Sequence, residues 1–90
     1  MSRQSDTEDV LQDFLADVAG NLDRLSHLRA ALRTVVAGTY AVRNETGDAW
    51  HWQIDAHGLA VENLWAPRQC AIPLADVEQL LDRHQARLLA

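Results

Sequence analysis

Two turn signals bracket a tryptophan-containing strand and constrain the fold of this chain more than any other feature. The segments Asn44-Glu45-Thr46-Gly47 and Asp55-Ala56-His57-Gly58 each open on an Asx residue and close on glycine. Asx side chains favour the start of a turn and glycine tolerates a left-handed backbone at its end, so each segment suits a type I turn with a glycine bulge. Between them, Ala49 to Ile54 alternates apolar and polar residues, as a half-buried strand does. The pattern predicts an antiparallel meander.

The register of this meander depends on the length of each turn. A three-residue loop in the first turn places Val42 opposite Trp50. The same loop in the second turn puts Leu59, Val61 and Trp65 on the face away from the tryptophans of the middle strand. A bulge or a two-residue loop would instead return them to the tryptophan face. The sequence leaves both registers open.

Helical sequence flanks the meander on both sides. The segment Ser5 to Glu8 has the pattern of a capping box that starts a helix. From Leu11 to Val35, apolar residues recur every three or four positions, and Gly38 is placed to end the helix. Gly20-Asn21 interrupts this pattern, because glycine inside a helix costs about 1 kcal/mol relative to alanine and asparagine can cap a new helix. One continuous helix and a kinked or split pair both remain open. A second periodic segment, from Leu74 to Leu88, predicts a C-terminal helix.

The expected fold is therefore an α+β domain in the order α-β-β-β-(β)-α. It has a long N-terminal helix, an antiparallel meander of three or four strands, and a C-terminal helix. The predicted strands span residues 39–43, 49–54 and 59–65, with residues 70–72 as a short fourth strand at the edge. Ninety residues suit one domain, here expected over residues 5–90 after a flexible tail at residues 1–4.

Composition narrows the classes of function. The formal net charge is −5, which argues against non-specific binding to phosphate backbones or anionic membranes. A single cysteine excludes an internal disulfide. The N-terminus carries no signal-peptide pattern, and no apolar run approaches the roughly 20 residues of a membrane helix. We expect a cytoplasmic protein that does not bind a membrane, and a nucleic-acid partner is disfavoured.

Residues capable of chemistry are scattered along the chain. The histidines and the cysteine lack the short spacing of familiar zinc sites. A cysteine nucleophile would need an oxyanion-binding glycine cluster or a helix start nearby, and neither follows it. We therefore expect no enzyme activity, no metal and no cofactor. The residues considered are His27, His51, Asp55, His57, Cys70 and His84.

Tryptophan and arginine most often anchor protein interfaces, and they predict the preferred contact surface. The predicted surface centres on Trp65, with Arg68 and Arg43 beside it. Leu59 and Val61 join it if the third strand faces outward.

Charged residues offer two further surfaces. Acidic residues on the polar face of the first helix form either a solvated surface or a ridge that imitates a nucleic-acid backbone and enters a basic channel of another protein. These residues are Asp6, Asp9, Asp13 and Asp17. An arginine cluster near one end of the helix and sheet supports an alternative function, a nucleic-acid-binding regulator. Its members are Arg24, Arg29, Arg33 and Arg43.

The function expected from these features is a small acidic protein that binds another protein as a regulator or inhibitor and forms a homodimer. The dimer is expected because the first helix and the second sheet face offer more apolar surface than ninety residues can bury. No family motif is present. The element order is loosely similar to that of small acidic secretion chaperones, which implies a chaperone-like homodimer as an alternative. The size and charge resemble those of phage-encoded anti-CRISPR proteins, which implies an inhibitor from a phage or mobile element.

Overall fold

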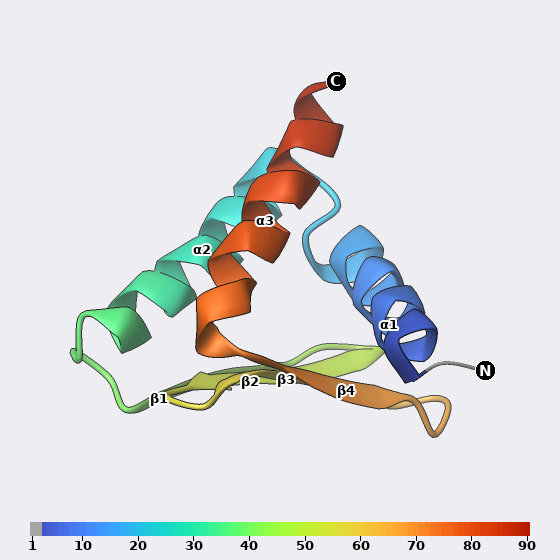
Figure 1. The fold of residues 1–90 in the computed structure, drawn as a ribbon, viewed down its shortest axis with the longest axis horizontal. Helices are drawn as coiled ribbons and strands as arrows, with labels where there is room; N and C mark the ends of the chain where they lie inside the picture. The colour runs from blue at the N-terminus through green and yellow to red at the C-terminus, as the bar shows by residue number, and fades with distance from the viewer. Residues whose placement is uncertain (1–2) are drawn as a thin grey trace.

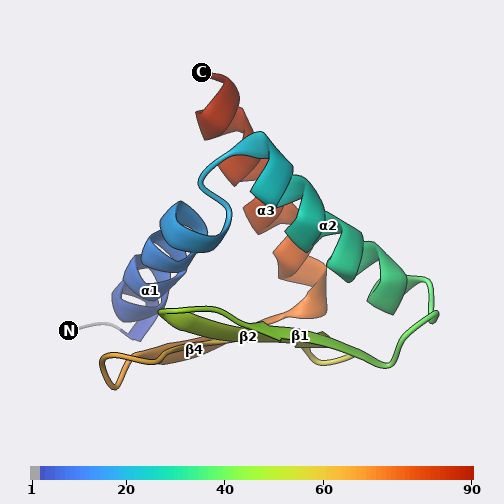
Figure 2. The ribbon, with the colours of Figure 1, turned by 180° about the vertical axis from the view of Figure 1, so that it is seen from behind.

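The computed structural model describes residues 3–90, with side chains from Thr7 onward. Three helices cover one face of a single antiparallel sheet whose strand order is β1-β2-β3-β4 (Figures 1 and 2). The α+β class and the four-stranded meander confirm the predicted fold. The elements are α1 (Arg3–Val18), α2 (Leu22–Val36), β1 (Val42–Thr46), β2 (Trp50–Asp55), β3 (Gly58–Asn63), β4 (Gln69–Pro73) and α3 (Leu74–Leu89).

The N-terminal helical segment is split into two helices at Gly20-Asn21. Asn21 has an extended backbone, and its side-chain oxygen accepts the N–H of Arg24 at 2.9 Å, which caps α2. A Cβ atom at Gly20 would lie 2.5 Å from the carbonyl oxygen of Ala16, so the break leaves no space for a side chain. The split lets α1 contact β3 and β4 while α2 contacts β1 and β2 (Figure 1).

The ends of these helices test two smaller predictions. Helix α1 begins at Arg3, so Ser5 lies in its first turn and the predicted tail is partly helical; residues 1–2 lie outside the described part of the chain. Helix α2 ends as predicted, because Gly38 adopts φ 77° after it. The N–H of Thr39 then reaches back to the carbonyl oxygen of Thr34 at 3.0 Å, as in a Schellman cap.

The first hairpin turns later than the sequence predicted. Asn44, Glu45 and Thr46 lie within β1, and the turn is closed by the N–H of Gly47 and the carbonyl oxygen of Trp50 at 2.8 Å. Val42 consequently pairs with Asp55, so the predicted pairing with Trp50 is wrong. The chain uses residues 37–41 to descend from the end of α2 to the sheet, and the strand cannot begin before that descent is complete (Figure 1).

The second hairpin has the two-residue loop that the sequence left open. Asp55 pairs with Gly58 around Ala56-His57, so Leu59 faces the same side as Ile54. Val61 lies on that side too, and the two side chains are only 1% and 2% exposed. The opposite, open face of the sheet carries mainly polar residues, among them His51, Gln53, Asp55, Glu62 and Gln69. The expectation of a second apolar sheet face is therefore wrong, because one residue of register moves every side chain to the other face.

The core fills the space between the three helices and the covered face of the sheet. The ring of Phe14 meets that of Trp50 edge to face, with centroids 5.6 Å apart. Ile54, Val77 and Leu81 are fully buried in the same core. Within residues 3–90, no helix combines the length and apolar character needed to cross a bilayer.

Candidate protein-contact surface

The loop between β3 and β4 holds a tryptophan outside the core. Trp65 is 79% exposed, more than any other large apolar residue among the side chains described. Its ring is nevertheless positioned, because the indole Nε1–H donates to the carbonyl oxygen of Asp48 at 2.9 Å. The side-chain oxygen of Asn63 accepts the N–H groups of Trp65 and Ala66 at 2.8 and 3.0 Å, which stabilises the start of the loop. The loop therefore presents an aromatic ring in one orientation.

Arg68 and Leu64 complete what we call the Trp65 surface. Arg68 donates to Asp13 of α1 at 2.7 Å and so joins the loop to the helix above it. Leu64 is 46% exposed, and its N–H donates to the carbonyl oxygen of Ala49 at 2.8 Å. Trp65 and Arg68 were predicted from the sequence, but Leu64 gave no sequence signal because it resembles an ordinary strand residue.

The other predicted members of this surface lie elsewhere. Leu59 and Val61 are buried against the helices, so they belong to the core. Arg43 pairs with Ile54 toward the opposite end of β2, and its guanidinium carbon lies 5.0 Å from the ring centre of Tyr40. Trp65 and Arg68 therefore belong to one loop, between β3 and β4, and Arg43 lies apart from them.

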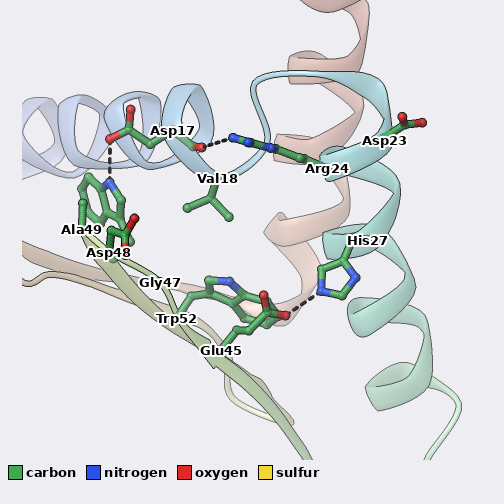
Figure 3. A pocket seen from close by; sticks show the side chains of 11 residues that line it. Asp17, Val18, Asp23, Arg24, His27, Glu45, Gly47, Asp48, Ala49 and Trp52 are labelled. Atoms are coloured by element: carbon green, nitrogen blue, oxygen red, sulfur yellow. Dashed lines mark hydrogen bonds and ion pairs between the residues drawn. The ribbon is translucent and has the colours of Figure 1, made fainter.

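A cleft of about 530 Å³ lies beside the Trp65 surface, between α1, α2 and the first hairpin (Figure 3). Asp48 connects the two, since it lines the cleft while its carbonyl oxygen holds the Trp65 ring. Trp50 and Trp52 line the cleft through the edges of otherwise buried rings, each 3% exposed. The remaining lining residues are Asp17, Val18, Asp23, Arg24, His27, Glu45, Gly47 and Ala49.

The cleft is acidic. Four aspartate or glutamate residues and one arginine line it, which gives its lining a formal charge of −3 when His27 is neutral. Three contacts fix its walls, and Figure 3 shows them. Asp17 accepts the indole N–H of Trp50 at 2.9 Å, Arg24 donates to the Asp17 carbonyl oxygen at 3.2 Å, and His27 meets Glu45 at 2.5 Å. A cationic group would be attracted to this cleft, which we call the acidic cleft.

Half of the predicted acidic ridge on α1 makes contacts within the protein. Asp13 pairs with Arg68, and Asp17 accepts from Trp50. Asp9 is exposed, and the side chain of Asp6 lies outside the described residues. Two of the four ridge residues therefore hold α1 to the sheet.

The predicted arginine cluster does not form a continuous basic surface. Arg29 bonds to Asp82 and Gln85 of α3 at 2.9 and 3.0 Å, which ties α2 to α3. Arg24 bonds back to α1, and Arg43 stacks on Tyr40 at the far end of α2. Arg33 lies in the last turn of α2. The nucleic-acid alternative gains no support from this arrangement.

The histidines and the cysteine are dispersed over the fold. Cys70 pairs with Val61 and lies on the helix-covered face of the sheet, where burial raises the pKa of its thiol. His51 lies on the open face, where its ring is hydrogen-bonded to the hydroxyl group of Thr46 at 2.7 Å. Nε2 of His84 is hydrogen-bonded to the carbonyl oxygen of Ala19 at 2.6 Å. Among the described side chains, no three His, Cys, Asp or Glu residues are grouped as metal ligands.

Asp55 is held by its own turn. The backbone N–H of His57, 2.8 Å away, and then the Gln53 amide lower the pKa of its carboxyl group below the ordinary value. These hydrogen bonds belong to a turn on the polar face of the sheet, and none of them joins Asp55 to a nucleophilic side chain.

Comparison with family models, with curated proteins and with solved structures found no match to this chain. The geometry of the Trp65 surface and of the acidic cleft therefore carries the functional argument.

Proposed function

We propose that this chain is a non-enzymatic cytoplasmic protein that binds another protein through the Trp65 surface, as a small regulator or inhibitor, and that it works as a homodimer. The observation that carries the proposal is a tryptophan that is 79% exposed while its indole N–H is held by a 2.9 Å hydrogen bond. Exposing such a ring in water is unfavourable, and fixing its orientation in advance lowers the entropy cost of binding.

The surroundings of Trp65 match those of known interface anchors. Tryptophan and arginine are enriched among residues that dominate binding energy, and Arg68 lies in the same loop. The adjoining acidic cleft would favour a partner with a basic group next to its apolar contact. We therefore expect the partner to offer an apolar pocket flanked by arginine or lysine.

The test compares two exposed aromatic residues at opposite ends of the sheet. Trp65→Ala removes the proposed anchor, and Tyr40→Ala is the matched control because Tyr40 is also exposed, at 52%. Tagged forms of both variants and of the wild type are used to capture partners from cells of the native source, and binding to the captured protein is then measured by calorimetry. We expect Trp65→Ala to weaken binding by about thirtyfold or more, as loss of an anchor does.

Thermal unfolding of both variants provides the control for folding. Both residues lie outside the core, so both variants should unfold close to the wild type. Equal binding by Trp65→Ala and the wild type would contradict the proposed surface. Loss of binding in Tyr40→Ala alone would move the contact to the other end of the sheet.

A further inference from the structure

The outer edge of β1 is an unpaired strand edge. β1 has β2 on one side and, among residues 3–90, no strand on the other. In an antiparallel pair, every second residue of a strand bonds to the neighbouring strand and the residues between point their backbone groups away from it. The N–H of Gly47 donates to the carbonyl oxygen of Trp50, so the odd-numbered residues of β1 are the ones that bond to β2. The N–H and C=O groups of Val42, Asn44 and Thr46 consequently point outward along the edge.

We propose that two copies of this chain join edge to edge through β1, as antiparallel strands related by a two-fold axis at Asn44. This inference rests on the homodimer of the proposed function and specifies the surface that forms it. In this register Asn44 faces Asn44 of the second copy, and Val42 faces Thr46 of the second copy. Every outward N–H and C=O group of the strand then has a partner, and the two sheets become one continuous eight-stranded sheet.

The charges on β1 select this register. Arg43 and Glu45 share the helix-covered face, because they pair with Ile54 and Trp52. A two-fold axis at Asn44 places each Arg43 directly opposite Glu45 of the second copy, at the closely spaced positions of an antiparallel pair. The nearest alternative registers that keep the hydrogen bonds between the copies place like charges together. One sets Arg43 opposite Arg43 of the second copy, and the other sets Glu45 opposite Glu45 of the second copy. β1 is thus complementary to itself in one register only.

The acidic cleft gives independent support for a second copy at this edge. Glu45 lines the cleft, so an Arg43 that enters from the second copy on the same face lies at its mouth. There it meets a wall whose formal charge is −3. Each copy would therefore supply the cation that the cleft of the other copy attracts, which also offsets repulsion between two chains of net charge −5.

The first test places proline at matched positions on the two sheet edges. Asn44→Pro removes an outward N–H of β1 and leaves its bonds to β2 intact, whereas Ala71→Pro does the same at the outer edge of β4. Light scattering at micromolar concentration should find a dimer for the wild type and for Ala71→Pro. The dimer dissociation constant of Asn44→Pro should rise by roughly tenfold or more, because two hydrogen bonds between the copies are lost.

A second test does not depend on the proline variant folding well. Asn44→Cys in a Cys70→Ser background places two thiols at a directly facing pair, about 5.5 Å apart between Cα atoms, which suits a disulfide. Mild oxidation should convert this variant to a covalent dimer. Ala71→Cys in the same background is the matched control and should remain uncoupled.

Exchanging the charges tests the register. Arg43→Glu alone sets like charges against each other and should weaken the dimer, and adding Glu45→Arg to the same chain should restore it. Failure of the double variant to recover would contradict the Arg43–Glu45 pairing.

The outcomes separate this inference from the proposed function. A wild-type dimer that persists in Asn44→Pro and is not cross-linked through Asn44→Cys would overturn the β1 edge and leave the homodimer standing. A wild-type monomer would overturn both the edge and the homodimer. Binding through Trp65, in the loop between β3 and β4, is measured separately and is unaffected by either result.

Discussion

The two edges of the sheet are built differently. β4 ends in Pro73, which has no N–H to offer and leads directly into α3, and the helix α1 packs over the strand. β1 instead has free backbone donors along its whole outer edge, with Arg43 and Glu45 on its covered face. Proline at an edge is a common protection against unwanted pairing. The two edges therefore differ in one respect: Pro73 removes a donor from the outer edge of β4, whereas every outward residue of β1 keeps its N–H, and β1 is the edge that we propose pairs with a second copy.

The largest expected change in stability is at Gly58, where the backbone of β3 lies close to that of β4. At Gly58 the backbone has φ 138°, and a Cβ atom would lie 1.9 Å from the carbonyl oxygen of Ile72 in β4. Gly58→Ala should therefore lower the free energy of unfolding by about 3 kcal/mol or more, through strain and displacement of β4. Urea denaturation followed by tryptophan fluorescence measures this change.

The matched variant on the other side is Gly38→Ala, in the connection from α2 to β1. Gly38 also has positive φ, at 77°, but nothing lies within 4 Å of the added Cβ. The loss should be about 1 kcal/mol, the cost of a left-handed backbone alone. Equal losses in the two glycine variants would show that close packing does not distinguish the edges.

A smaller effect is expected from Pro73→Ala. Pro73 has φ −61°, which fits its ring, and its nitrogen points to the outer edge of β4, so the ring breaks no bond of the sheet. Replacing it should lower the free energy of unfolding by about 0.4–1 kcal/mol, because the unfolded chain gains freedom. Urea denaturation is again the measurement, and a more stable variant would show that the proline strains the edge.

The smallest effect concerns chemical access to the two edges. Burial raises the pKa of the Cys70 thiol in β4, so less thiolate is present at neutral pH and alkylation by iodoacetamide should be slower than in the urea-unfolded chain. The rate should increase as the pH rises. A cysteine at Asn44 in the Cys70→Ser background should react faster when dilute, because that position is exposed on β1. Equal rates at both positions would remove this distinction.

Much of the fold followed from local signals. Gly38, the turn Asp55-Ala56-His57-Gly58 and the periodicity of Leu74 to Leu88 each acted through neighbouring residues, so the sequence was enough to place them. The first turn was misplaced because Asn44 to Gly47 has turn composition, yet the distance from α2 to the sheet required these residues in the strand. Leu59 and Val61 were ambiguous, since one loop residue decides which face they occupy.

The candidate site was recovered only in part, for a related reason. Trp65 and Arg68 stood out by residue type and by their position after a strand. The acidic cleft had no sequence signal, because Asp17, Glu45 and Asp48 come from a helix, a strand and a turn that meet only in the folded chain.

The sequence by itself determined the class of fold, the order of its elements and the glycine that ends α2, because each depends on contacts within a few residues; it left open whether the helical segment divides at Gly20-Asn21. Only the tertiary structure decided which sheet face is covered, which edge stays open and which charges meet in the cleft. Those properties depend on the register of strands and on contacts between residues far apart in the chain, which local composition does not specify.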